Sequence, residues 1–177
     1  FPRLRDVIRA LVNLKNIRMR IILAKTGEIK EGYADWDDKV IRIKEKWVLG
    51  DPSIIIHEMI HQLQFSLCGG SAYMRSDFER NIEFEAYLIM DISMAEAWLK
   101  QGMIPDASKL HFLYGVDDTV LVMDYINFLC RVYERTISKE EFVSEFNRFA
   151  EKFEAYLGAE YSPSGTPSLI FSLWPDR

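Results

Sequence analysis

The chain has 177 residues, of which 49% are apolar, so it can bury a substantial core and is most simply one domain spanning residues 1–177. Its net charge of -5 disfavours a nucleic acid as partner, because nucleic-acid backbones favour basic surfaces. No apolar run approaches the roughly 20 residues of a membrane span, so we expect a soluble protein. The lack of a signal-peptide core slightly favours a cytoplasmic location, although the chain starts at Phe1 and not at methionine. Nothing indicates the oligomeric state.

The first part of the chain predicts a helix followed by a small sheet. Apolar residues at a helical period predict a helix over residues 3–15. Alternating apolar residues then predict a strand over residues 17–23. Two extended runs around a polar turn predict a hairpin over residues 32–43. We therefore expect a small antiparallel or mixed sheet before residue 51.

A buried helix is predicted from about Asp51 to Cys68. Asp51 or Ser53 can cap its free amides, and Pro52 suits a first helical turn. The glycines at positions 69 and 70 can end it, because glycine takes the left-handed conformation at little cost. Apolar residues lie on most sides of this helix, so we expect it in the middle of the domain. Residues 1–70 thus form the first part of the fold.

Residues 71–158 are predicted to be mainly helical. Capping-box patterns begin helices at Ser76 and Ser138 that continue to about residues 99 and 157. A further helix is predicted over residues 118–134, and a short helical piece over 106–114. In the tail, 159–177, residues 168–174 predict a short strand or a segment laid over the surface. Together with the N-terminal sheet, this gives an α+β fold class.

The predicted helix over residues 51–68 carries a His-Glu-x-x-His pattern. His57 and His61 are two of only three histidines in the chain, and four-residue spacing places them one above the other on a helix. Two imidazoles can therefore face one metal ion, while Glu58 can reach a water molecule on it. Catalytic zinc usually takes three protein ligands and leaves a fourth position to water, so a third ligand must come from elsewhere.

The helix predicted from Ser76 offers two candidates for this third ligand. Glu85 lies on an otherwise apolar stripe of that helix, where an unpaired carboxylate costs several kcal/mol and a metal ion would compensate it. Glu83 is the competing candidate, on a more polar face that it shares with Glu79 and Tyr87. We predict Glu85 as the ligand and keep Glu83 as the alternative.

These residues resemble the zincin metallopeptidases, and within them the gluzincins, whose third zinc ligand is a glutamate on the following helix. The resemblance implies that His57, His61 and Glu85 bind Zn²⁺ and that Glu58 is the general base. Such enzymes often carry an acidic residue four positions after the ligand glutamate to orient the first histidine. Ile89 stands there in this chain, so Asp91 or another group is expected to take that role.

The resemblance implies a zinc-dependent peptidase that hydrolyses peptide bonds of a peptide or protein substrate through a zinc-bound water. Glu58 would take the proton of that water and deliver it to the leaving amine. The developing oxyanion needs a further donor, for which His111, Tyr114, Tyr73 and Arg75 are candidates. An exposed strand of the hairpin would hold an extended peptide by strand addition, as in the family that the chain resembles.

Other interpretations compete with a peptidase. The histidines could be satisfied core residues, or the domain could bind zinc in a regulatory or interaction role without catalysis. A di-iron bundle would need Glu-x-x-His on two helices, and only one copy is present. The deformylase pattern needs a cysteine before the motif, and none precedes Cys68. The extended metzincin pattern is absent, because Gln64 and Leu67 stand where its glycine and third histidine would be.

Overall fold

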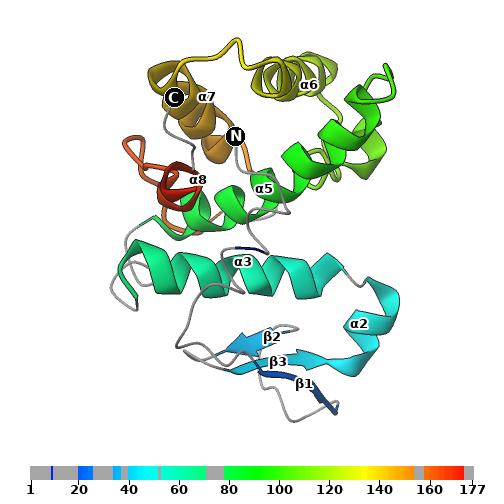
Figure 1. Cartoon of the computed structure of the whole chain (residues 1–177), viewed down its shortest axis with the longest axis vertical. Coiled ribbons are helices and arrows are strands. Elements are labelled where there is room, and N and C mark those ends of the chain that lie inside the picture. The colour runs from blue at the N-terminus through cyan, green and yellow to red at the C-terminus, as the bar shows by residue number, and fades with distance from the viewer. Residues whose placement is uncertain are drawn as a thin grey trace.

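The computed structural model describes residues 9, 20–25, 34–36, 40–51, 53–70, 78–153 and 158–173. In this part of the chain a small sheet lies on one side of a long helix, and a group of helices lies on its other side (Figure 1). The described residues are mainly helical, with one small N-terminal sheet. The first predicted helix falls almost entirely outside the described residues.

The sheet has three strands in the order β1-β3-β2, with β1 at Arg20–Ala24, β2 at Ala34–Trp36 and β3 at Val40–Lys44. β1 runs parallel to β3, and β2 runs antiparallel to it. The β2-β3 pair confirms the predicted hairpin and makes the sheet mixed. Ile41 and Ile43 of β3 are completely buried, so the central strand joins the core.

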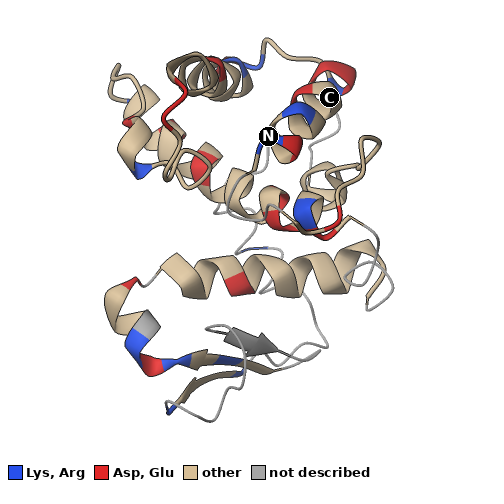
Figure 2. Cartoon of the chain, turned by 180° about the vertical axis from the view of Figure 1, so that it is seen from behind, with Lys and Arg blue, Asp and Glu red and all other residues tan. Residues whose placement is uncertain are grey.

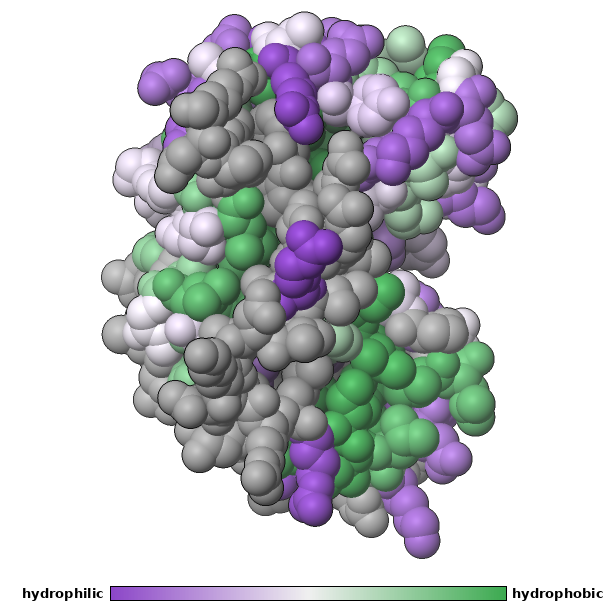
Figure 3. Space-filling view, viewed as in Figure 1, coloured by the Kyte–Doolittle hydropathy of each residue, from purple (hydrophilic) through white to green (hydrophobic). Residues whose placement is uncertain are grey.

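Short helix α2, at Glu45–Gly50, follows β3 directly and was not predicted. Its Leu49 is exposed, as are Ile21 and Leu23 of the edge strand β1. Figure 3 shows a large apolar area at this end of the molecule.

Helix α3, at Ser53–Cys68, is the central element and confirms the predicted motif helix. At its start the Asp51 Oδ1 atom accepts hydrogen bonds from the Ser53 amide, at 2.9 Å, and from the Ser53 hydroxyl, at 2.6 Å. At its end Gly69 and Gly70 have φ angles of 121° and 67°, which glycine adopts without the steric cost of a Cβ atom. The sequence therefore fixes both ends of this helix locally.

Helix α5, at Glu79–Leu99, packs against α3, α6, α7 and α8. The capping box predicted for it involves Ser76, which lies outside the described residues. A 3-10 turn at Ala107–Lys109 replaces the longer helical piece predicted over 106–114. No helix among the described residues combines the length and apolar character needed to cross a membrane.

Two C-terminal helices begin at their predicted positions. Helix α6, at Thr119–Glu134, is capped by the Asp118 side chain, and helix α7, at Lys139–Glu151, begins with the predicted capping box of Ser138 and Glu141. The predicted continuation of α7 to residue 157 is wrong at Lys152 and Phe153, which are non-helical, and residues 154–157 are not described.

The strand or surface segment predicted over 168–174 is wrong. Ser168–Ser172 form a short helix, α8, whose Leu169 and Ile170 are completely buried. The mixture of apolar and serine residues in this segment has no clear period over such a short length, so the sequence did not predict this helix, which packs against α3 and α5.

Candidate metal centre

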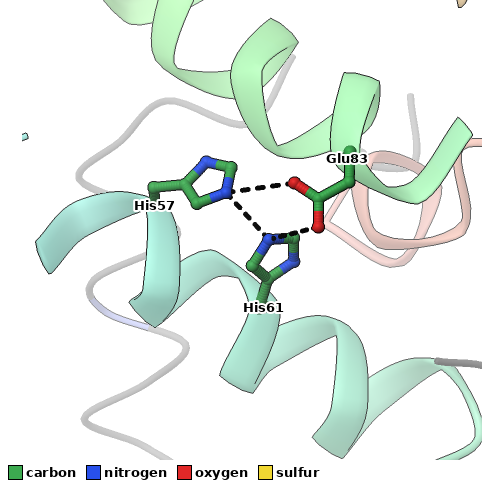
Figure 4. Close-up of side chains that lie close together, drawn as sticks. All are labelled: His57, His61 and Glu83. Atoms are coloured by element: carbon green, nitrogen blue, oxygen red, sulfur yellow. Dashed lines mark hydrogen bonds and ion pairs between the residues drawn. The ribbon is translucent and has the colours of Figure 1, made fainter. Parts of the chain in front are cut away.

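The two histidines of the motif meet Glu83 of helix α5 in the layer between α3 and α5 (Figure 4). His57 and His61 are both buried, and their Nε2 atoms lie 2.9 Å apart. The Glu83 Oε2 atom lies 3.2 Å from His57 Nε2, and its Oε1 atom lies 3.1 Å from His61 Nε2. Three potential ligand atoms from two helices therefore converge on one point.

This group fits a metal ion in both chemistry and size. Two imidazole nitrogens and one carboxylate oxygen are a common ligand set of catalytic zinc. Ligand atoms around a tetrahedral zinc ion lie about 3.4 Å apart when the bonds are 2.0–2.1 Å long. The separations of 2.9–3.2 Å are close to this value, so only small side-chain movements are needed. His57, His61 and Glu83 could therefore hold a metal ion.

The three side chains are electrostatically coupled. Burial alone would lower the pKa of His61, but the negative charge of Glu83 and their hydrogen bond outweigh it and raise that pKa to about 9. Burial would raise the pKa of Glu83, but the two histidines hold it well below its usual value. Burial and the charge of His61 lower the pKa of His57. Without a metal, Glu83 is thus ionised and His61 carries a hydrogen on both ring nitrogens, and a metal ion bound at Nε2 would have to displace the hydrogen there.

Glu58 is the only Asp, Glu, Lys or Arg residue of α3 and gives the single red segment on this helix in Figure 2. Its side chain is buried, and this burial raises its pKa to about 7, opposed by the charge of His61 and assisted by that of Glu83. A carboxyl group with a pKa near neutrality is well matched to accepting a proton. Glu58 is therefore a buried carboxyl group on the same helix as the two histidines, with a raised pKa.

Glu85, predicted as the third ligand, does not join this group, and the structure brings in the alternative, Glu83. The Glu85 Oε2 atom accepts a hydrogen bond from Gln64 Nε2 at 2.9 Å, and its Oε1 atom accepts one from the Ile170 amide at 2.9 Å. The apolar stripe that carries Glu85 faces the protein interior, whereas Glu83 faces the histidines. Protein donors, and not a metal ion, thus compensate the buried Glu85 side chain.

Asp91 does not orient His57. Its Oδ1 atom accepts hydrogen bonds from the amide of His111 at 2.7 Å and from the ring Nδ1 of His111 at 2.9 Å. Its Oδ2 atom accepts hydrogen bonds from the Phe112 amide and the Tyr125 hydroxyl. Burial opposes the charge on His111, but the hydrogen bond and charge of Asp91 outweigh it, so the pKa of His111 is raised. Asp91 therefore fixes His111.

Tyr87, to which the sequence analysis assigned no role, contacts the rings of both His57 and His111. Its ring centre lies 4.4 Å from that of His57 and 5.5 Å from that of His111. Tyr87 follows Glu83 by four residues, which places both side chains on one face of α5. The shared polar face of Glu79, Glu83 and Tyr87 is the sequence signal that could have identified this side of the helix as the functional one.

A cavity of about 300 Å³ opens beside the metal-ligand group. His57 forms part of its wall, and both predicted oxyanion donors, His111 and Tyr114, line it as well. Tyr114 is 90% exposed, whereas the side chain of His111 is only 22% exposed. The other two candidate donors, Tyr73 and Arg75, lie outside the described residues. The remaining lining is mixed, with the apolar residues Ile54, Met90, Leu110 and Phe153, the polar residues Asp51, Ser53, Ser108 and Lys109, and Tyr87.

Comparisons with known proteins do not assign the chain to a family. No protein-family model, curated protein or solved structure matches it.

Proposed function

We propose that this protein is a zinc-dependent metallopeptidase whose metal ligands are His57, His61 and Glu83. The observation that carries the proposal is the convergence of these three ligand atoms within a buried layer, with Glu58 beside them on α3. A cavity that shares His57 with this group offers room for a substrate side chain. The arrangement corresponds to the His-Glu-x-x-His pattern with a glutamate on a later helix.

The chain's own residues divide the work of hydrolysis in this proposal. A bound zinc ion would lower the pKa of a water molecule and polarise the carbonyl group that is attacked. Glu58 takes a proton from the attacking water and later transfers it to the leaving amine. Burial raises the pKa of Glu58, which favours proton uptake, and a neighbouring cation would counteract this shift in the resting enzyme.

His111 is the better-supported candidate for stabilising the oxyanion. The carboxylate of Asp91 can only accept hydrogen bonds, so it holds a proton on His111 Nδ1. The other ring nitrogen, Nε2, can then donate a hydrogen bond only when the imidazole is protonated. Because the pKa of His111 is raised, this protonated form persists above the ordinary histidine range. A cationic donor at the cavity wall suits a developing negative charge.

Replacing His111 with leucine is expected to lower kcat by about 100-fold without changing the zinc content, because one oxyanion donor is lost. The wild-type rate is also expected to fall as the pH rises through the raised pKa of His111, and this decrease should be absent in the variant. Measuring kcat against pH for both proteins checks this. A parallel Tyr114→Phe variant serves as comparison, and loss of activity in that variant alone would assign the role to Tyr114.

The alternative function is a zinc-binding regulatory or interaction domain without catalysis. It shares the metal site, so metal content alone does not distinguish it from a peptidase. The motif retains Glu58, which a binding site does not need, and this favours the enzyme.

Peptides or proteins are the proposed substrates, and the edge strand β2 is the proposed place for an extended peptide to pair.

The test is to measure the zinc content of the purified protein and its cleavage of an unstructured protein substrate. We expect one equivalent of zinc, cleavage that stops after chelation, and recovery of cleavage when zinc is added back. A protein that binds no zinc under these conditions would contradict the proposal as a whole. Stoichiometric zinc with no cleavage of any unstructured substrate would instead support the non-catalytic alternative.

A further inference from the structure

Gln64 connects His61 to Glu85 through buried hydrogen bonds. It follows His61 by three residues on α3, and its side chain is completely buried. The Gln64 Oε1 atom lies 2.7 Å from His61 Nδ1. Its Nε2 atom donates to the backbone oxygen of Ile82 at 3.0 Å and to Glu85 Oε2 at 2.9 Å. Gln64 thus touches the ring nitrogen of His61 that faces away from His57 and Glu83.

These contacts determine which way the Gln64 amide points. The backbone oxygen of Ile82 can only accept a hydrogen bond, so the atom of Gln64 that faces it must be the NH₂ group. The oxygen of Gln64 is then the atom that faces His61. A carbonyl oxygen can only accept, and therefore Nδ1 of His61 must carry the hydrogen in this contact.

The consequence is a defined tautomer of His61. With its hydrogen on Nδ1, a neutral imidazole presents the unprotonated Nε2 atom as a metal ligand. This is the nitrogen that lies 2.9 Å from His57 Nε2 and 3.1 Å from Glu83 Oε1. Metal-ligating histidines usually donate their other ring hydrogen to such a partner, which fixes the ring and strengthens the metal bond.

We propose that Gln64 and Glu85 are positioning residues for the metal centre and hold His61 with Nε2 directed at the metal. Glu85 acts through Gln64, because it fixes the amide that accepts the His61 hydrogen. Its second oxygen is held by the Ile170 amide, so helix α8 completes this chain of hydrogen bonds. The inference rests on the proposed zinc site and gives a function to a buried glutamate that is not itself a ligand.

The test compares zinc affinity in three variants by competition with a chromophoric chelator. Gln64→Met removes the acceptor for His61 and is expected to weaken zinc binding by about 10- to 100-fold. Glu85→Gln keeps the size of the side chain but removes one of its two acceptor atoms, and a loss of about 10-fold is expected. Gln62→Met is the matched control, because Gln62 is equally buried on α3 and donates to the Ser66 hydroxyl at 3.4 Å. Its zinc affinity should match the wild type.

A second measurement does not depend on the variants folding. Long-range ¹H–¹⁵N NMR of the zinc-loaded wild-type protein should show His61 protonated at Nδ1 and bound to zinc through Nε2. Zinc bound through Nδ1 would overturn the proposal, as would equal zinc affinities of the Gln64→Met and Gln62→Met variants. A wild-type protein without zinc would instead overturn the proposed function, so the two failures are distinguishable.

Discussion

Replacing Glu83 with glutamine is expected to remove zinc from the purified protein. The substitution keeps the shape of the side chain but eliminates the negative charge that faces His57 Nε2 at 3.2 Å and His61 Nε2 at 3.1 Å. A neutral amide is a much weaker zinc ligand than a carboxylate, and we expect the affinity to fall by about 100-fold or more. Metal analysis of the purified variant, followed by chelator competition, measures this loss.

Two variants on the same helix provide the comparison for Glu83. Glu79→Gln makes the same chemical change one helical turn earlier, at an exposed position, and should keep its full zinc content. Glu85→Gln should keep stoichiometric zinc with weaker binding, since Glu85 contacts Gln64 and Ile170. Retention of zinc by Glu83→Gln together with its loss from Glu85→Gln would restore the ligand assignment made from the sequence.

Replacing Glu58 with glutamine is expected to abolish measurable peptidase activity while leaving the zinc content unchanged. Glutamine cannot accept the proton of the attacking water, and general base catalysis typically contributes about 100- to 10,000-fold to the rate. The fold should tolerate the change, because Glu58 is buried and burial already disfavours its charged form. Zinc content and the cleavage rate of an unstructured protein, measured on the same preparation, separate the two effects.

The Glu79→Gln protein, purified in the same way, controls for the acid-to-amide change itself and should cleave at the wild-type rate. If the Glu58→Gln protein cleaves the substrate as fast as this control does, Glu58 is not the base. Loss of both zinc and cleavage would mean that Glu58 supports the metal site itself. Only loss of cleavage with retained zinc agrees with the proposed mechanism.

Local signals account for the parts of the fold that were predicted correctly. Helix α3 has a capping residue, Asp51, at its start and two glycines at its end, so its bounds follow from neighbouring residues. The capping box of Ser138 and Glu141 fixes the start of α7 in the same way. Helix α8 has no side-chain cap, and what marks it in the structure is tertiary packing, since Leu169 and Ile170 are completely buried and the helix contacts α3 and α5.

The choice between Glu83 and Glu85 could not be made from the pattern of one helix. An apolar stripe indicates a buried face, but α5 packs against four helices, so the pattern does not tell which neighbour a buried residue meets. A metal site with an open position for water belongs near the accessible side of the layer. Glu83, with 15% of its side chain exposed, meets that condition better than the completely buried Glu85.

The link from Glu85 to the Ile170 amide has a consequence for the assembly of the protein during synthesis. The histidines and Glu83 leave the ribosome long before residue 170, yet the hydrogen bonds that orient His61 are complete only when helix α8 has docked. Tight metal loading should therefore be one of the last events of maturation. If the proposed zinc site is correct, a nascent chain that still lacks this helix would have all three candidate ligands but would hold the metal less tightly.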